Sequence, residues 1–196
     1  VYTQLRDAGA VLVAKFTLGA LAQGDWWFGG RTKNPWNQNF GSSGSSAGSA
    51  SATVAGLVPF AIGTETLGSI VSPSHTCGAT GLRPTFGAVS RSGGMTLCWS
   101  LDKTGPICRS AEDAAVVFYY IKGTDGKDPG AVNMPFNYSA KTDIKKLRIG
   151  YAKNFFDRIK DTSASEWKVI KAFEQMGVQL IPVNFPDTAA YPYDLV

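Results

Sequence analysis

The chain has 196 residues, of which 44% are hydrophobic and 17% are charged, a composition typical of a globular domain and not of a disordered segment. A net charge of +4, carried by scattered lysines and arginines, is too weak to indicate nucleic acid or an anionic membrane as a partner. One histidine and three cysteines without a CxxC pair argue against a usual zinc site, and no apolar run has the length of a membrane span.

The first elements follow one another closely. Thr3–Ala8 has the character of a helix end, closed by Gly9 as its C-terminal cap. The apolar run Ala10–Ala14 predicts a buried strand. Residues 24–47 form a long loop rich in glycine, asparagine and serine, and its three tryptophans indicate that it is ordered. The small residues of Gly48–Leu57 predict a thin, closely packed helix.

The middle of the chain carries a strand and a well-marked helix. Val58–Ile62 predicts a second buried strand that ends in a turn at Gly63. Ser110 opens a capping-box-like sequence with an acid at the third position. It predicts the start of an apolar helix that runs through Ile121 and ends at Gly123.

The last part repeats the alternation of strand and helix. A surface excursion over Gly123–Tyr138 precedes a strand at Leu147–Tyr151. Ser163 is expected to open a second capping box, whose helix ends at Gly177, and a further strand follows at Val178–Val183. This order predicts an α/β layered fold with a largely buried sheet.

Two glycine-flanked serine turns are the features that carry chemistry. They lie in Gly41–Ala50 (GSSGSSAGSA) and Gly63–Ile70 (GTETLGSI), with Ser45 and Ser69 24 residues apart. Glycine lets backbone N–H groups approach a ligand closely, and serine supplies a nucleophile, a combination that favours acyl transfer. A flexible linker is the plainer interpretation, but this run continues directly into a small-residue helix and a strand.

Two known serine motifs fit less well. Gly44-x-Ser46-x-Gly48 matches the nucleophile elbow of α/β-hydrolases, but no strand precedes it and His75, the sole histidine, lies only 29 residues after Ser46. A P-loop is excluded because no Gly-Lys-Ser or Gly-Lys-Thr follows the glycines. Without histidine, a neutral lysine can act as the base, and a second serine can pass the proton.

Short segments spread over nearly the whole chain share the motifs of one family. They are Asn34–Asn37, Ser45–Ala50, Ala55–Pro59, Gly63–Ile70, Cys77–Gly78, Gly81–Gly87, Ser90–Arg91, Ser100–Asp102, Gly105–Ile107, Arg109–Ala115, Leu147–Gly150 and Met176–Gly177. Together they resemble the amidase signature family. The resemblance implies a mixed, largely buried β-sheet flanked by helices. It also implies that residues 1–196 are a single, incomplete domain whose N-terminal and C-terminal parts lie outside this sequence.

The resemblance also implies roles for individual residues in a Ser–cis-Ser–Lys triad. Ser69 matches the nucleophile, and Ser45 matches the bridging serine beside a cis peptide bond. Ser46 is expected to add a supporting hydrogen bond. The backbone N–H groups that match the oxyanion hole belong to Thr66, Leu67, Gly68 and Ser69.

The third triad member is expected upstream of Val1. In the family the catalytic lysine lies on an apolar strand well before the serine run. Lys15 instead matches a later Gly-Lys-Thr segment, so it is expected to help hold the loop. Lys33 and Lys103 are expected to be surface or structural residues.

The chain also departs from the family at single positions. Leu67 stands where glycine is usual, Val71 where arginine is common, and Glu65 where aspartate is usual. Ser43 and Ala47 replace usual glycines in the serine run. These departures bear on the range of substrates.

The expected function is therefore amide hydrolysis through an acyl-enzyme on Ser69, with a small-molecule amide as substrate and no metal or organic cofactor. No direct nucleic-acid or membrane partner is expected, and this piece alone is expected to be inactive. The odd count of cysteines, Cys77, Cys98 and Cys108, is interpreted as reduced thiols, with one disulfide as the open alternative, and a cytoplasmic location is favoured. Three alternatives stay open, namely a glutamine-hydrolysing subunit of a tRNA-dependent amidotransferase, a non-catalytic binding protein and a histidine-dependent esterase. A homodimer and amidotransferase partner subunits are the assemblies left open.

Overall fold

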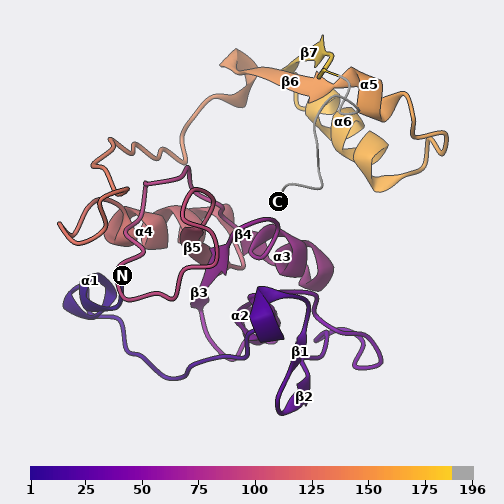
Figure 1. Cartoon of the computed structure of the whole chain (residues 1–196). Helices are drawn as coiled ribbons and strands as arrows, with labels where there is room; N and C mark the ends of the chain where they lie inside the picture. The colour runs from indigo at the N-terminus through magenta and orange to yellow at the C-terminus, as the bar shows by residue number, and fades with distance from the viewer. Residues whose placement is uncertain (187–196) are drawn as a thin grey trace. The chain divides into compact units, whose positions relative to one another are not determined.

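The computed structural model describes residues 1–186 and divides the chain into two compact units, Val1–Tyr138 and Ser139–Val196 (Figure 1). Strands and helices alternate in both, so the fold is mixed α/β, with sheets flanked by helices. Within residues 1–186, no helix is both long and apolar enough to cross a membrane.

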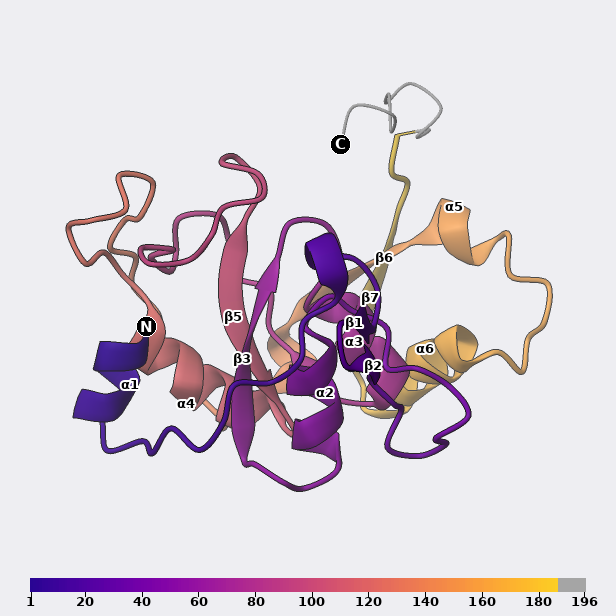
Figure 2. The ribbon, with the colours of Figure 1, turned by 60° about the horizontal axis from the view of Figure 1, so that its bottom comes forward.

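The first unit is built on a three-stranded antiparallel sheet. Its order is β3 (Phe60–Glu65), β5 (Lys103–Cys108) and β4 (Thr80–Gly81), and Figure 2 shows β3 and β5 side by side. Gly63 lies opposite Gly105 in the β3–β5 register. Gly63 is thus inside β3, which begins two residues later and ends three residues later than the sequence suggests, and the expected turn at Gly63 is wrong.

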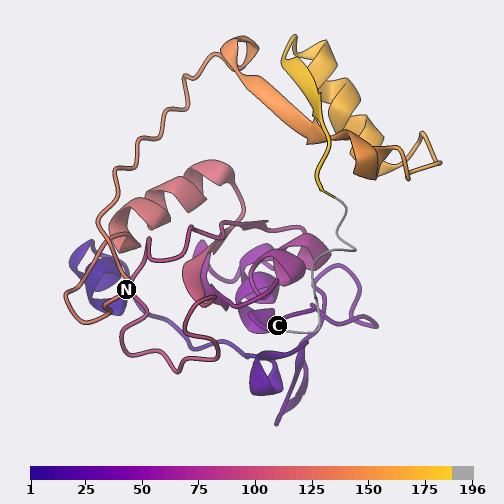
Figure 3. The same ribbon diagram turned by 45° about the horizontal axis from the view of Figure 1, so that its top comes forward.

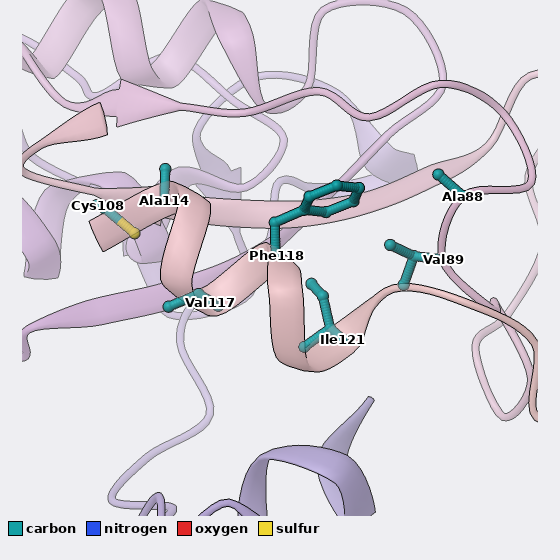
Figure 4. Packing of buried hydrophobic residues seen from close by; sticks show 7 residues of the cluster. All are labelled: Ala88, Val89, Cys108, Ala114, Val117, Phe118 and Ile121. Atoms are coloured by element: carbon teal, nitrogen blue, oxygen red, sulfur yellow. The ribbon is translucent and has the colours of Figure 1, made fainter. Parts of the chain in front are cut away.

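Neighbouring residues of a strand point to opposite faces of a sheet. Neighbouring buried residues of β5 accordingly pack against helices on the two faces. Ile107 packs with Ala50 of α2 (Ala47–Val54) and Cys77 of α3 (Val71–Cys77). The next residue, Cys108, belongs to a second cluster built on α4 (Ala111–Ile121). Figure 4 labels its seven buried members, Ala88, Val89, Cys108, Ala114, Val117, Phe118 and Ile121.

The two helices with clear capping signals in this unit have them as expected. The Ser110 hydroxyl accepts a 3.1 Å hydrogen bond from the Asp113 N–H at the start of α4. This bond satisfies one of the orphan donors of the first turn. At the end of α1 (Tyr2–Asp7), Gly9 adopts φ +91°, the left-handed conformation that favours glycine in a helix cap.

Ala10–Ala14 is not a buried strand, and that prediction is wrong. Val11, Leu12 and Val13 are 82%, 64% and 69% exposed, and no described strand pairs with them. An apolar run becomes a buried strand only where partner strands and a covering layer accept it. Here the segment instead lines one side of a cavity of about 620 Å³, opposite β3.

The long loop of residues 24–47 is ordered, as its tryptophans indicate. It contains a short hairpin of β1 (Trp26–Trp27) and β2 (Gly30–Arg31), preceded by the 3-10 turn η1 (Ala20–Ala22). The Trp36 indole N–H donates to the carbonyl oxygen of Cys77 at 2.8 Å. The loop is therefore tied to the end of α3.

The second unit pairs β6 (Arg148–Ala152) with β7 (Gln179–Val183) in parallel, and α6 (Ser165–Gln175) packs against β7 (Figure 3). Two short elements complete it, η2 (Ile144–Lys146) and α5 (Lys153–Phe156).

The predicted capping box of the second unit is wrong. The N-cap of α6 is Ala164, which has no side-chain cap hydrogen bond. The Ser163 hydroxyl donates instead to Asp161 at 2.7 Å, so a local turn claims the side chain that the helix start would have used.

Candidate active site

The first serine segment is a buried loop that leads into α2. Ser45 is 1% exposed and Ser46 is 2% exposed, and the Gly44–Ser45 peptide bond is cis, as the family resemblance implies. The carbonyl oxygen of Ser45 accepts a 3.0 Å hydrogen bond from the Gly19 N–H. A Cβ at Gly44 would overlap the carbonyl oxygen of Gly24, so only glycine allows the two backbones to approach this closely.

An ion pair between buried Asp25 and exposed Arg31 fixes the entry to this loop. One oxygen of Asp25 accepts the Ser43 N–H at 3.0 Å, and the other accepts the Arg31 guanidinium at 2.9 Å. Ser43 itself has φ +60°, in the left-handed region where glycine is more usual. Sequence reasoning missed Asp25, which precedes two tryptophans and has no motif of its own.

The second serine segment is the turn between β3 and α3, residues Thr66–Ser69. Gly68 has φ +92°, and Ser69 is buried at 8% exposure, whereas Leu67 is 70% exposed. Within residues 1–186, the N–H groups of Leu67 and Ser69 donate to no acceptor. Two unsatisfied N–H groups at one turn match the requirement of an oxyanion hole.

The structure brings the two serine segments together. The Ser46 N–H donates a 3.1 Å hydrogen bond to the carbonyl oxygen of Ser69, and the hydroxyls of Ser43 and Ser72 share one of 2.8 Å. The Ser45 hydroxyl is buried and has no hydrogen-bond partner among the described residues, Ser69 included. A buried hydroxyl without a partner is costly, and among the described residues Thr53 and Ser74 also have one. Ser45 differs from these two in lying on the loop that contacts the Ser69 turn.

Ser46 has a structural role in this arrangement. Its hydroxyl donates to the Thr64 carbonyl at 3.0 Å and accepts the Thr64 N–H at 3.1 Å. The Ser49 hydroxyl donates to the Ile62 carbonyl at 2.9 Å, on the same edge of β3. β3 is an edge strand, and hydroxyls from the start of α2 thus form the hydrogen bonds with its free backbone edge that a further strand would form. Because Ser46 is engaged on both sides, the nucleophile-elbow interpretation loses its nucleophile.

Two carboxylates that sequence reasoning did not assign hold the turn. Glu65 accepts the N–H groups of Ile70 and Val71 at 2.7 and 2.9 Å. Asp102 accepts the Thr66 hydroxyl at 2.5 Å and, with its other oxygen, the Leu97 N–H at 2.7 Å. Both acids stand at strand ends, Glu65 within β3 and Asp102 directly before β5, and both lie in segments that carry the family resemblance.

Both carboxylates are held ionised. Burial acts to raise the pKa of Glu65, but N–H donation from Val71, Ile70 and Gly68 outweighs it, so the pKa lies below the usual value. Burial likewise opposes the shift at Asp102, where the Thr66 hydroxyl and two N–H groups lower the pKa. The turn is therefore stabilised by charge-assisted hydrogen bonds.

The candidate bases lie as follows. Lys15 is exposed and lines the cavity opposite β3, while the carbonyl of nearby Thr17 accepts the Gly48 N–H at 3.0 Å and so contacts the start of α2. The Lys103 ammonium donates to the Thr66 carbonyl at 3.4 Å, a structural contact at the edge of the turn. His75 is exposed on α3, which gives the histidine-dependent esterase no support.

The two buried thiols are inert. Burial raises the pKa of the Cys77 thiol to about 11 and that of Cys108 to about 12, so neither forms a thiolate at neutral pH. All three cysteines are free thiols. Among residues 1–186, no group of three or more His, Cys, Asp or Glu side chains is arranged to hold a metal ion.

Comparison with known proteins decides the family. The family model described as Amidase matches residues 1–193. The chain belongs to the amidase family. The A subunit of glutamyl-tRNA(Gln) amidotransferase from Coxiella burnetii is 39% identical over 196 residues, covering 96% of this chain and 41% of that protein. Its counterpart from Acinetobacter baumannii is 40% identical over 201 residues, covering 97% and 41%.

Solved structures of amidase family members agree. The A subunit of glutamyl-tRNA(Gln) amidotransferase from Thermotoga maritima superposes with a TM-score of 0.85 at 32% identity, covering 94% of this chain and 42% of that one. Native peptide amidase from Stenotrophomonas maltophilia gives a TM-score of 0.83 at 34% identity, covering 96% and 42%. The chain thus spans about two fifths of the length of these relatives.

Proposed function

We propose that the complete protein hydrolyses an amide bond by acyl transfer to Ser69. The observation that carries the proposal is the contact between the two serine segments, in which the Ser46 N–H donates to the Ser69 carbonyl at 3.1 Å. It sets the turn with its unsatisfied N–H groups beside the loop that holds the unpartnered Ser45 hydroxyl. Nucleophile, relay and oxyanion donors then belong to one site.

The first half of the reaction forms the acyl-enzyme. The Ser69 hydroxyl oxygen attacks the amide carbonyl carbon while its proton passes to Ser45, which gives its own proton to a neutral lysine. We place this lysine upstream of Val1, because Lys15 is exposed and the Lys103 ammonium donates to the Thr66 carbonyl. The tetrahedral oxyanion is met by backbone N–H groups of the turn, including those of Leu67 and Ser69.

The second half releases the acid. Collapse of the intermediate breaks the carbon–nitrogen bond, and the leaving amine takes a proton from Ser45, which recovers one from the lysine. Water then attacks the acyl ester by the same route and restores the Ser69 hydroxyl. The proton count closes without a cofactor, and a small-molecule amide is the substrate class.

Active-site labelling of the complete protein with a fluorophosphonate tests this proposal. We expect mass spectrometry to find the probe on Ser69. Ser69→Ala should abolish labelling and lower amide turnover by about 10⁴-fold or more. Ser45→Ala should lower both by about 10²- to 10⁴-fold, the range of proton-transfer catalysis.

A matched control is available on α2. The Ser51 hydroxyl donates to the Lys33 carbonyl at 2.7 Å, outside the two serine segments, so Ser51→Ala should leave labelling unchanged. A properly folded complete protein that is neither labelled nor hydrolyses amides would support a non-catalytic binding protein instead. Normal amide turnover by Ser69→Ala would refute Ser69 as the nucleophile.

A second candidate is the glutamine-hydrolysing subunit of a tRNA-dependent amidotransferase. The 39% identity to the A subunit of a glutamyl-tRNA(Gln) amidotransferase favours it. It predicts that L-glutamine is hydrolysed, that partner subunits co-purify and that the ammonia is transferred to an acylated tRNA. Hydrolysis of simple amides by the isolated protein, as a monomer or a homodimer with no other partner retained, would favour the stand-alone amidase.

A further inference from the structure

A buried carboxylate outside the proposed proton relay lies against the turn that carries Ser69. Glu65 is the last residue of β3, and its side chain is 0% exposed. One oxygen, Oε2, accepts both the Ile70 N–H at 2.7 Å and the Val71 N–H at 2.9 Å. The other, Oε1, faces the Arg83 guanidinium at 3.4 Å. The side chain thus reaches over the turn and closes it from strand end to helix start.

The two hydrogen bonds that matter most fall on one peptide unit. The carbonyl of Ser69 and the N–H of Ile70 belong to the same planar group. Its carbonyl accepts the Ser46 N–H at 3.1 Å, and its N–H donates to Glu65 at 2.7 Å. A plane held at both of its polar ends resists rotation, so the position of the Ser69 Cα and the direction of its Cα–Cβ bond are constrained.

We propose that Glu65 is a positioning residue, which orients the Ser69 hydroxyl and the free N–H groups of the turn by gripping the Ser69–Ile70 peptide unit. This inference rests on the proposed acyl transfer to Ser69. The Glu65 side chain is fully buried, so it offers no surface to a substrate. It acts through the backbone of the residues it holds.

The charge of the side chain is part of this role. Two N–H donors converge on a single oxygen, and a guanidinium faces the other one. A carboxylate satisfies all three, whereas the amide of a glutamine would turn an NH₂ group either toward the N–H donors or toward Arg83. Aspartate keeps the charge and loses one methylene of reach, so it is the conservative replacement.

The experiment compares Glu65→Gln and Glu65→Asp in the complete protein. The first readout is fluorophosphonate labelling of Ser69, resolved into the maximal labelling rate and the half-saturating probe concentration. Glu65→Gln should lower the maximal rate about 100-fold with little change in half-saturation, because a displacement near 1 Å costs about this much. Glu65→Asp should recover most of the loss.

Asp128→Asn is the matched control. Asp128 is also a buried carboxylate with an arginine partner, Arg91, at 2.8 Å, and it has no contact with the turn. It should lower the melting temperature as much as Glu65→Gln and leave the maximal labelling rate unchanged. Equal losses of labelling in both variants would reduce Glu65 to a residue that serves folding alone.

A second readout does not depend on activity. Amide hydrogen exchange at Ile70 and Val71 should rise about tenfold or more in Glu65→Gln and stay near the wild-type rate in Glu65→Asp. Unchanged exchange at both amides would overturn the inference even if labelling fell. A wild-type protein that is never labelled would instead refute the acyl-transfer proposal, so the two failures are told apart.

Discussion

The N–H of Ser46 donates to the carbonyl oxygen of Ser69 across 3.1 Å, which joins a loop and a turn that are separate in the sequence. Ser46 is fixed in turn by two hydrogen bonds between its hydroxyl and the backbone of Thr64. The same edge of β3 therefore holds the loop directly and the turn through Ser46. A displacement of this edge of β3 is therefore expected to displace Ser69 as well.

The first prediction concerns the Ser46 hydroxyl. Ser46→Ala leaves a donor and an acceptor of Thr64 without their partner, and we expect a loss of about 1–3 kcal/mol in the free energy of unfolding. Ser49→Ala is the control, because its hydroxyl makes a single bond, to the Ile62 carbonyl at 2.9 Å. Urea denaturation of both variants checks the order. A larger loss for Ser49→Ala would contradict the double role of Ser46.

The second prediction concerns close backbone packing at Gly44. Gly44→Ala would push a methyl group into the carbonyl oxygen of Gly24, and backbone at both positions would have to move. We expect loss of fluorophosphonate labelling and a fall of more than about 2 kcal/mol in stability. At Gly150 an added Cβ meets its nearest atoms, those of Val183, at 3.7 Å, so Gly150→Ala is the tolerated control. Normal labelling of Gly44→Ala would show that the loop can shift freely.

The third prediction concerns acid stability. Hydrogen bonds from the Arg91 side chain hold the pKa of Asp128 well below its usual value, against the opposing effect of burial. Because the folded-state pKa is depressed, the stabilisation is complete above the unfolded-state pKa of about 4 and is lost as the pH falls through the folded-state value. Unfolding free energy should therefore decrease below about pH 4, and Asp128→Asn should flatten this decrease.

An exposed pair supplies the comparison for this prediction. Lys153 and Asp157 are 2.6 Å apart, but their side chains are 49% and 56% exposed. Solvent screens such pairs, so Asp157→Asn should change stability by less than about 1 kcal/mol and leave the pH profile as it is. Equal profiles for wild type and Asp128→Asn would remove Asp128 from the acid transition.

Sequence signals succeeded where the information is local. The Ser110 cap and the left-handed Gly9 depend on neighbours within one helical turn, and both are present. The long tryptophan-bearing loop is ordered because Trp36 reaches the end of α3. The family resemblance placed the cis bond beside Ser45, a feature that no propensity scale signals.

Where partners lie far away in the sequence, prediction failed. Ala10–Ala14 has the composition of a buried strand, but burial depends on elements that its own residues do not specify. Asp102 could not be assigned because its partner Thr66 lies 36 residues away, although each stands at a strand end. Ser163 is a local failure of another kind, since it lost its cap role to Asp161, two residues earlier.

The last prediction concerns the long-range contact of Asp102. This side chain joins two loops, since one oxygen accepts the Thr66 hydroxyl and the other accepts the N–H groups of Leu97 and Cys98. Asp102→Ala should free both loops. We expect amide exchange at Leu97 and Cys98 to rise about tenfold. Labelling of Ser69 should fall, because the turn loses its hydrogen bond at Thr66 and is then held only at the Glu65 end.

Single removals separate the two arms of the Asp102 contact. Thr66→Val deletes only the hydroxyl, so it should slow labelling of Ser69 while exchange at Leu97 stays low, because Asp102 still accepts that N–H at 2.7 Å. Asp113→Ala removes an equal charge from the exposed start of α4 and should alter neither. If Thr66→Val raises exchange at Leu97 as much as Asp102→Ala does, the two loops move as one body and the carboxylate is not an independent link. If neither variant slows labelling, the Thr66 end of the turn does not orient Ser69, and its geometry depends on the Glu65 end alone.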